Sequence, residues 1–186
     1  GNTGFSIAMV SVIKGYDCIL AVSSKSSPDK IDMLRAMGAK VYVCPAHVSA
    51  DDPRSYYQVA RQMHDEMKGS VYINQYFNEL NIDAHYQSTG PEIWEQTGGR
   101  IDAFTCSVGT GGTIAGVGTA LKERNSDIQI VLSDPMGSGL FSLYTQGEAK
   151  PEGSSITEGI GQGRITKNLE NAPIDAFQQV SDEEAL

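Results

Sequence analysis

The chain has 186 residues, of which 40% are hydrophobic and 20% charged, so it can bury a core and is not expected to be disordered. Its net charge is −9, and no Lys/Arg-rich run occurs, which argues against nucleic-acid binding. The most membrane-like stretch, residues 5–13, is too short to cross a bilayer and lacks the features of a signal peptide. The three cysteines (Cys18, Cys44 and Cys106) form no CxxC pair, and the three histidines share no metal-binding spacing. We therefore expect a cytoplasmic protein with no metal site and no membrane association.

The first 74 residues alternate helix and strand signals. Residues 5–14 are apolar nearly all round, which predicts a buried helix that ends at Gly15. Two further helices have a start signal and a closing glycine: Ser27-Pro28 with Gly38, and Asp52-Pro53 with Gly69. Short apolar runs between the helices predict buried strands over residues 18–22, 41–44 and 71–74.

The second half continues this alternation. Helices are predicted over residues 91–96 and 114–122, and strands over residues 101–108 and 128–132. Trp94 fits a core position, and residues 136–163 are predicted to be one long, loop-rich stretch. Helices between short apolar strands predict parallel pairing, and hence an α/β fold with a layered parallel sheet.

The strongest candidate site is the glycine loop Gly109-Thr110-Gly111-Gly112-Thr113, which lies between a predicted strand and a predicted helix. Such a turn points several backbone N–H groups toward one spot beside a helix N-terminus, where an anion is favoured. The spacing fits neither a GxGxxG fingerprint nor a Walker A loop. A phosphate site is the favoured interpretation, and a glycine-rich turn that only packs the helix on the sheet is the alternative.

Three other segments carry weaker signals. Asn2 or Thr3 could cap the helix that follows, or leave N–H groups free for a carboxylate. Gln75 and Asn78 follow a predicted strand, where parallel sheets gather ligands, although a turn network explains them about as well. Residues 158–163 have glycine at every second position, which is typical of backbone beside a bulky ligand, of a lid, or of a plain loop.

Taken in order, these segments resemble the cysteine synthase and cystathionine β-synthase family, pyridoxal-phosphate enzymes of the tryptophan synthase β-like fold type. The resemblance spans essentially the whole chain and is carried by residues 1–4, 38–39, 75–78, 109–113 and 158–161. It implies two lobes: residues 1–75 in a smaller lobe that closes over the substrate, and residues 76–186 in a larger cofactor-binding lobe.

The resemblance also implies the roles of single residues. The loop formed by Gly109, Thr110, Gly111, Gly112 and Thr113 would hold the phosphate of pyridoxal 5′-phosphate. Asn2 and Gly159 would contact the rest of the cofactor, and Thr3 and Gln75 would hold the substrate carboxylate. The family's Schiff-base lysine would precede residue 1, and the partner of the pyridine nitrogen would follow residue 186. We therefore expect a fragment, truncated at both ends, with no catalytic lysine and no activity alone.

The implied reaction of the parent enzyme is β-replacement on O-acetylserine or serine with sulfide, which forms cysteine. Cystathionine β-synthase activity, with serine and homocysteine, is the alternative within the family: Tyr76, His85-Tyr86 and Asp134-Pro135 favour it, whereas residues 161–165 favour cysteine synthase. The resemblance further implies a homodimer with an amino-acid substrate as its small-molecule partner. A non-catalytic phosphate- or nucleotide-binding α/β module is the alternative from another class, and it would need the glycine loop but no substrate loop.

Overall fold

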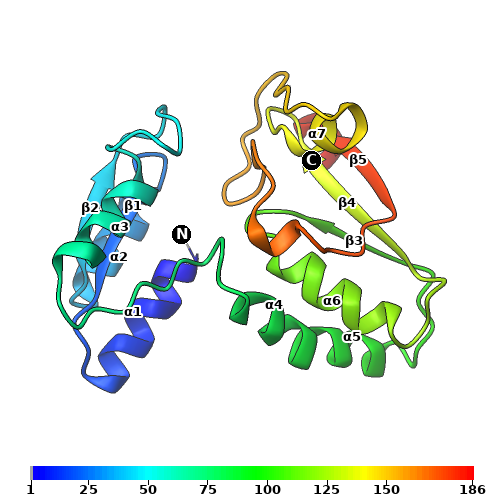
Figure 1. The fold of residues 1–186 in the computed structure, drawn as a ribbon, viewed down its shortest axis with the longest axis horizontal. Helices are drawn as coiled ribbons and strands as arrows, with labels where there is room; N and C mark the ends of the chain where they lie inside the picture. The colour runs from blue at the N-terminus through cyan, green and yellow to red at the C-terminus, as the bar shows by residue number, and fades with distance from the viewer. Residues whose placement is uncertain (1) are drawn as a thin grey trace. The chain divides into compact units, whose positions relative to one another are not determined.

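The computed structural model describes residues 2–186 and divides into two compact units, a first unit up to Tyr72 and a second unit over Ile73–Leu186 (Figure 1). Each unit has its own sheet and its own apolar core. Every strand pair in both sheets is parallel, which confirms the predicted α/β class.

The first unit packs helices on a two-stranded sheet. Its elements are α1 (Asn2–Lys14), β1 (Ile19–Ser23), α2 (Pro28–Ala36), β2 (Lys40–Cys44) and α3 (Tyr56–Glu66). Strand β1 runs parallel to β2 with Ile19 opposite Lys40. Its core gathers small and medium apolar side chains of the helices and strands: Ala8, Cys18, Val22, Leu34 and Ala39.

The helix start signals are confirmed in one case and wrong in the other. Ser27 caps α2, because its Oγ accepts a hydrogen bond from the Lys30 amide at 3.4 Å. Asp52 does not start α3: its carboxylate binds Arg54 instead, with 2.7 Å between Arg54 Nη2 and Asp52 Oδ2. Ser55 takes the capping position and accepts a hydrogen bond from the Gln58 amide. The strand predicted over residues 71–74 is also wrong, because this stretch is a loop.

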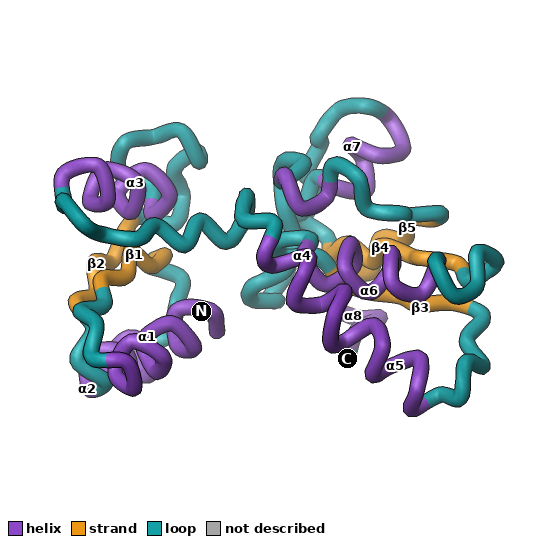
Figure 2. The backbone as a smooth tube through the Cα atoms, turned by 60° about the horizontal axis from the view of Figure 1, so that its bottom comes forward, coloured by secondary structure: helices purple, strands orange, loops and turns teal. Residues whose placement is uncertain are grey.

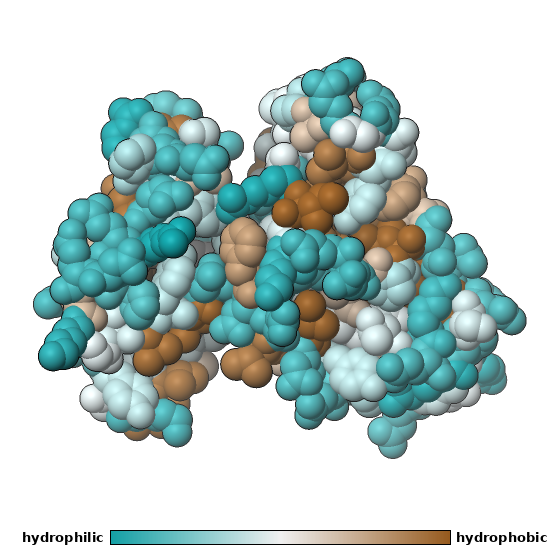
Figure 3. All heavy atoms as spheres, viewed as in Figure 1, coloured by the Kyte–Doolittle hydropathy of each residue, from teal (hydrophilic) through white to brown (hydrophobic). Residues whose placement is uncertain are grey.

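Helix α1 is not the buried helix that its composition predicts. It already begins at Asn2, and only Ala8 and Ser11 are buried. Apolar side chains gather at the surface over this helix (Figure 3), namely Met9, Val10, Val12 and Ile13, which are 47% to 76% exposed. Only one side of α1 can pack against the small sheet of this unit, although the helix is apolar on all sides. The apolar side chains on its other side therefore stay exposed in this unit.

The second unit is built on the sheet β3-β4-β5, with all strands parallel. Its strands are β3 (Ala103–Ser107), β4 (Gln129–Pro135) and β5 (Ala176–Val180). Around them lie the helices labelled in Figure 2: α4 (Leu80–Ala84), α5 (Gly90–Gln96), α6 (Gly112–Lys122), α7 (Leu140–Gln146) and α8 (Asp182–Ala185). The unit also contains the π-helix η1 (His85–Thr89) and the 3-10 helix η2 (Lys167–Leu169). The prediction of one long loop over residues 136–163 is wrong in part, because α7 lies within this stretch.

Helix α6 is the centre of the second unit. Ile114, Val117 and Leu121 on this helix are fully buried and share a core cluster with Ile130 and Leu132 of β4. Burying side chains of this size stabilises a fold by about 1.5–3 kcal/mol each. Trp94 packs against the same cluster, as predicted.

Two glycines bring α6 close to the continuous helical segment α4-η1-α5. A Cβ added to Gly90 would lie 2.5 Å from the Cβ of Ala120, and one added to Gly116 would lie 2.8 Å from the Tyr86 amide nitrogen. Real Cβ atoms essentially never approach so closely. The helices can therefore pack at this distance only because both positions lack a side chain.

Candidate functional site

The glycine loop leaves β3 and leads directly into α6. Gly111 occupies the N-cap position in the left-handed conformation, with φ 91°, and as a glycine it has no side chain to cap the helix. The first N–H groups of a helix have no acceptor within the helix itself. Together with the helix dipole, they make the start of α6 a favourable place for an anion.

The loop is shaped by close packing on both sides. A Cβ at Gly111 would lie 2.5 Å from Leu169 Cγ, and a Cβ at Gly112 would collide with the side chain of Asn81. Thr166, which is fully buried, donates a hydrogen bond from its hydroxyl to the Thr110 carbonyl at 2.7 Å. Segments η2 and α4 thus hold the loop from two directions.

Both threonine hydroxyls of the loop contact the α4-η1 segment. Asn81 Nδ2 donates to Thr110 Oγ1 at 2.9 Å, and His85 Nε2 lies 3.1 Å from Thr113 Oγ1. The other ring nitrogen of His85 lies 2.9 Å from Thr89 Oγ1. Burial lowers the pKa of His85, so its imidazole is neutral at pH 7.

Gln75 is tied to the same loop through its backbone. Its carbonyl oxygen accepts hydrogen bonds from Asn81 Nδ2 at 3.1 Å and from Asn168 Nδ2 at 2.9 Å. Asn78 behaves differently: its side chain bonds to the Ile73 carbonyl and the Leu80 amide, which is the local turn network considered as the alternative for this residue.

The segment around Gly159 also reaches the glycine loop. The Gly161 amide donates to the Val108 carbonyl at 2.8 Å, and a Cβ at Gly109 would collide with the Gly159 carbonyl oxygen. Gly159 itself has a left-handed φ of 84°. The two glycine-rich segments therefore meet backbone to backbone.

The second unit thus brings together the glycine loop, Gln75 and Gly159. The other two candidates, Asn2 and Thr3, belong to the first unit, where they form the first turn of α1 and are exposed. The Asn2 carbonyl accepts a hydrogen bond from the Ser6 hydroxyl at 3.3 Å.

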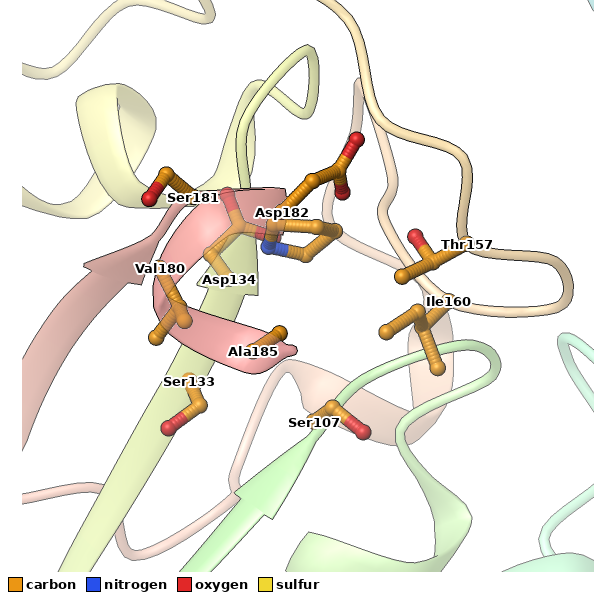
Figure 4. Close-up of a pocket in the computed structure, with 10 residues that line it drawn as sticks. Ser107, Ser133, Asp134, Thr157, Ile160, Val180, Ser181, Asp182 and Ala185 are labelled. Carbon is orange, nitrogen blue, oxygen red and sulfur yellow. The ribbon is translucent and has the colours of Figure 1, made fainter.

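A cavity of about 150 Å³ opens at the carboxyl ends of the three strands (Figure 4). Ser107, Ser133 and Val180 line it from the strands, and Thr157 and Ile160 line it from the segment that contains Gly159. Ligands of parallel α/β sheets collect at this edge. The cavity therefore adjoins the start of the glycine loop and the Gly159 segment.

The remaining chemically active groups offer no competing centre. Cys18, Cys44 and Cys106 are free, and burial raises the pKa of the Cys106 thiol, so it is a poor nucleophile at neutral pH. Among residues 2–186, no group of three or more His, Cys, Asp or Glu side chains could hold a metal ion. No helix within the same residues is both long and apolar enough to span a membrane.

The residues that hold the site together, Asn81, Asn168 and Thr166, were not predicted from the sequence, and neither was a role in the site for His85. Asn81 lies 29 residues from Thr110, and Asn168 lies 93 residues from Gln75. None of these residues stands in a recognisable motif. The only signal in the sequence is that Asn81 follows three residues after Asn78, at the end of the polar cluster around Gln75.

The chain is similar to known proteins over its whole length. A family model described as "Pyridoxal-phosphate dependent enzyme" matches residues 1–186. Cysteine synthase 1 of Emericella nidulans is 46% identical over 191 residues, covering 100% of this chain and 51% of that protein. Cystathionine beta-synthase of Apis mellifera is 40% identical, covering 100% of this chain and 36% of that protein.

Among solved structures, an O-acetylserine dependent cystathionine beta-synthase from Helicobacter pylori is similar, with a TM-score of 0.86 and 32% identity. The match covers 99% of this chain and 57% of that one. The chain thus spans about half the length of the cysteine synthases that it matches.

Proposed function

Because the chain belongs to the family of pyridoxal-phosphate-dependent enzymes, we propose that the protein that carries it is a cysteine synthase. It would form cysteine by β-replacement on O-acetylserine, or serine, with sulfide. The proposal is supported by 46% identity to two fungal cysteine synthases over the whole chain. The observation that carries it is the convergence of Gln75 and Gly159 on the glycine loop within one unit.

The glycine loop fits the phosphate of pyridoxal 5′-phosphate. The start of α6 offers N–H donors after Gly112, whose own amide faces Thr110 Oγ1 at 3.4 Å, and Thr110 and Thr113 add hydroxyl groups. Gly111 needs its left-handed backbone, and Leu169 fills the space that a side chain would take, so this turn into α6 requires glycine at position 111. When bound, this cofactor supplies an electron sink that eases loss of the α-proton and of the β-leaving group.

The remaining site residues would orient cofactor and substrate. In this proposal Asn2 donates to the ring hydroxyl of the cofactor, and the Gly159 backbone lies beside the ring. Thr3 and Gln75 hold the substrate carboxylate with their hydroxyl and amide donors. As the resemblance implies, residues 1–75 would form a smaller lobe and residues 76–186 a larger one, with Gln75 at the junction and bonded through its carbonyl to Asn81 and Asn168 of the larger lobe. Closure of the smaller lobe would exclude water from the reacting atoms.

Cystathionine β-synthase activity is the second candidate, because proteins of that name are 36–40% identical over the whole chain. The deciding experiment gives the full-length protein O-acetylserine with sulfide in one assay and serine with homocysteine in another. We expect the larger kcat/KM with O-acetylserine and sulfide. A larger value with serine and homocysteine would replace the first proposal by the second. Activity with neither pair would favour a non-catalytic phosphate-binding module. The convergence of Gln75 and Gly159 on the glycine loop argues against such a module.

We further propose a cytoplasmic homodimer. The cytoplasmic assignment is supported by three free cysteines, which a reducing compartment preserves. The dimer follows from the family resemblance and accords with the exposed apolar side of α1. Light scattering of the full-length protein after gel filtration would give twice the chain mass.

A further inference from the structure

One side-chain amide joins two segments of the proposed site. Asn81 Nδ2 lies 3.1 Å from the Gln75 carbonyl oxygen and 2.9 Å from Thr110 Oγ1. A primary amide nitrogen carries two hydrogens and accepts none. Asn81 can therefore serve both acceptors at once, one with each hydrogen.

This contact fixes the direction of the Thr110 hydroxyl. Because Asn81 Nδ2 is only a donor, Thr110 Oγ1 must accept in this pair, and the Gly112 amide also points to the same oxygen at 3.4 Å. A hydroxyl oxygen has two lone pairs and one hydrogen. With both lone pairs facing protein donors, the hydrogen of Thr110 remains for a third partner beside the start of α6.

Asn81 is itself held in place. Its side chain packs directly on Gly112, where a Cβ would collide with it. One helical turn after Asn81, the side chain of His85 likewise contacts a threonine hydroxyl of the glycine loop, that of Thr113. The Gln75 carbonyl is steadied from the other side by Asn168, which is buried. The amide is thus anchored at both ends of its hydrogen-bond bridge.

We propose that Asn81 is a positioning residue that ties the Gln75 segment to the glycine loop and leaves the Thr110 hydroxyl as a donor to the cofactor phosphate. The inference rests on the proposed function, because it takes the glycine loop as the phosphate site. Asn81 acts through Thr110 and Gln75 and does not itself touch the phosphate.

The test is a double-mutant cycle in the full-length protein, with pyridoxal phosphate as the probe. Asn81→Leu keeps the size of the side chain and removes both donors, and Thr110→Val removes the hydroxyl. We expect each single change to raise the dissociation constant of the cofactor about tenfold, the value of one lost hydrogen bond of about 1.4 kcal/mol. In the Thr110→Val background, Asn81→Leu should add less than about twofold, because the hydroxyl it orients is already gone.

Two further readouts separate positioning from general loss of structure. The ³¹P resonance of the bound cofactor should shift by the same amount in Asn81→Leu and Thr110→Val. The KM for O-acetylserine should rise in Asn81→Leu but not in Thr110→Val, since only the former frees the Gln75 carbonyl. Asn125→Leu is the matched control, because Asn125 bonds locally to the Asp127 amide beyond the far end of α6. It should leave all three values unchanged.

The outcomes distinguish the two proposals. A wild-type protein that binds no pyridoxal phosphate would refute the proposed function. A wild type that binds it, with an unchanged affinity in Asn81→Leu or a full tenfold loss in the Thr110→Val background, would refute the positioning role of Asn81. Trp94 fluorescence checks that each variant is folded; if Asn81→Leu is not, Asn81→Ala is carried through the same cycle with the same expectations.

Discussion

Gly116 on α6 offers a stringent test of the helix packing in the second unit. Gly116→Ala adds one methyl group whose carbon would lie 2.7 Å from His85 Cβ and 2.8 Å from the Tyr86 amide nitrogen, and which would collide with the Ile82 carbonyl. Two of these three atoms belong to the backbone, so no side-chain rotation can relieve the overlap. The α4-η1 segment has to move away from α6.

The magnitude combines two opposing effects. Overpacking of this kind costs about 1–3 kcal/mol, and about 2–3 kcal/mol is expected here because backbone atoms must shift. Replacing glycine by alanine within a helix returns about 1 kcal/mol. The net loss in the free energy of unfolding is therefore about 1–2 kcal/mol. With a urea dependence of about 2 kcal/mol per molar, the unfolding midpoint falls by about 0.5–1 M.

The assay is urea unfolding followed by the fluorescence of Trp94, the single tryptophan, which packs against the core of the second unit. Gly163→Ala is the matched control, because no atom lies within 4 Å of the added carbon. It should change the free energy of unfolding by less than about 0.5 kcal/mol. An unchanged or higher midpoint for Gly116→Ala would refute the argument that this glycine sets the distance between α6 and η1.

Three further changes have definite expected outcomes. Leu132→Ala, in the fully buried core, should lower the free energy of unfolding by about 2–5 kcal/mol in the same Trp94 assay, and a loss below 1 kcal/mol would contradict its place there. Burial raises the pKa of Asp134, so its contribution to stability is fully present below the unfolded pKa and is lost as pH rises through the folded pKa. Asp134→Asn lacks this contribution, so its stability relative to wild type should increase from pH 4 to pH 8. A constant difference between the two proteins would contradict the shift. Ser27→Ala removes the α2 cap and should speed hydrogen exchange of the Lys30 amide about fivefold, whereas Ser27→Asp should not.

Local signals in the sequence predicted the local structure well. Ser27 and Gly38 delimit α2 because a cap and a left-handed glycine each act within one turn of helix. The glycine loop was predicted for the same reason: its conformation depends on its own residues and on the strand and helix it joins. Ser181 begins α8 with a capping box, whose Ser-x-x-Glu pattern is also local in the sequence.

The errors arise where a residue has a competing partner nearby, or where an element depends on partners from other parts of the chain. Asp52 carries a start signal, but its carboxylate is used by Arg54, two residues away, and Ser55 caps the helix instead. Strand β5 was missed because its run Ala176–Val180 contains two glutamines and alternates weakly, and its pairing with β4 determines it. Helix α7 was missed within a polar loop, where Asp134 steadies its first turn by accepting from the Phe141 amide at 2.8 Å.

In the candidate site, too, residues with local signals could be predicted and residues with distant partners could not. The glycine loop and the segments of Gln75 and Gly159 could be found from their own residues, and the structure brings all three together. Asn81 could not be assigned, because its partners Gln75 and Thr110 come from different elements and meet only after α4 packs on α6.

The π-helix η1 fixes the rotational phase between α4 and α5. A π-turn contains one more residue than an α-turn, and each residue turns a helix by about 100°. Deleting one residue from His85–Thr89 would turn α5 by that angle relative to α4. If Asn81 then faced Gly112, Gly90 would be turned away from Ala120. If Gly90 faced Ala120, Asn81 would be turned away from Gly112. The extra residue in η1 is thus what lets a single helical segment meet both ends of α6, and we expect this stretch to be far less tolerant of length changes than of substitutions at Gln87 and Ser88, which are exposed.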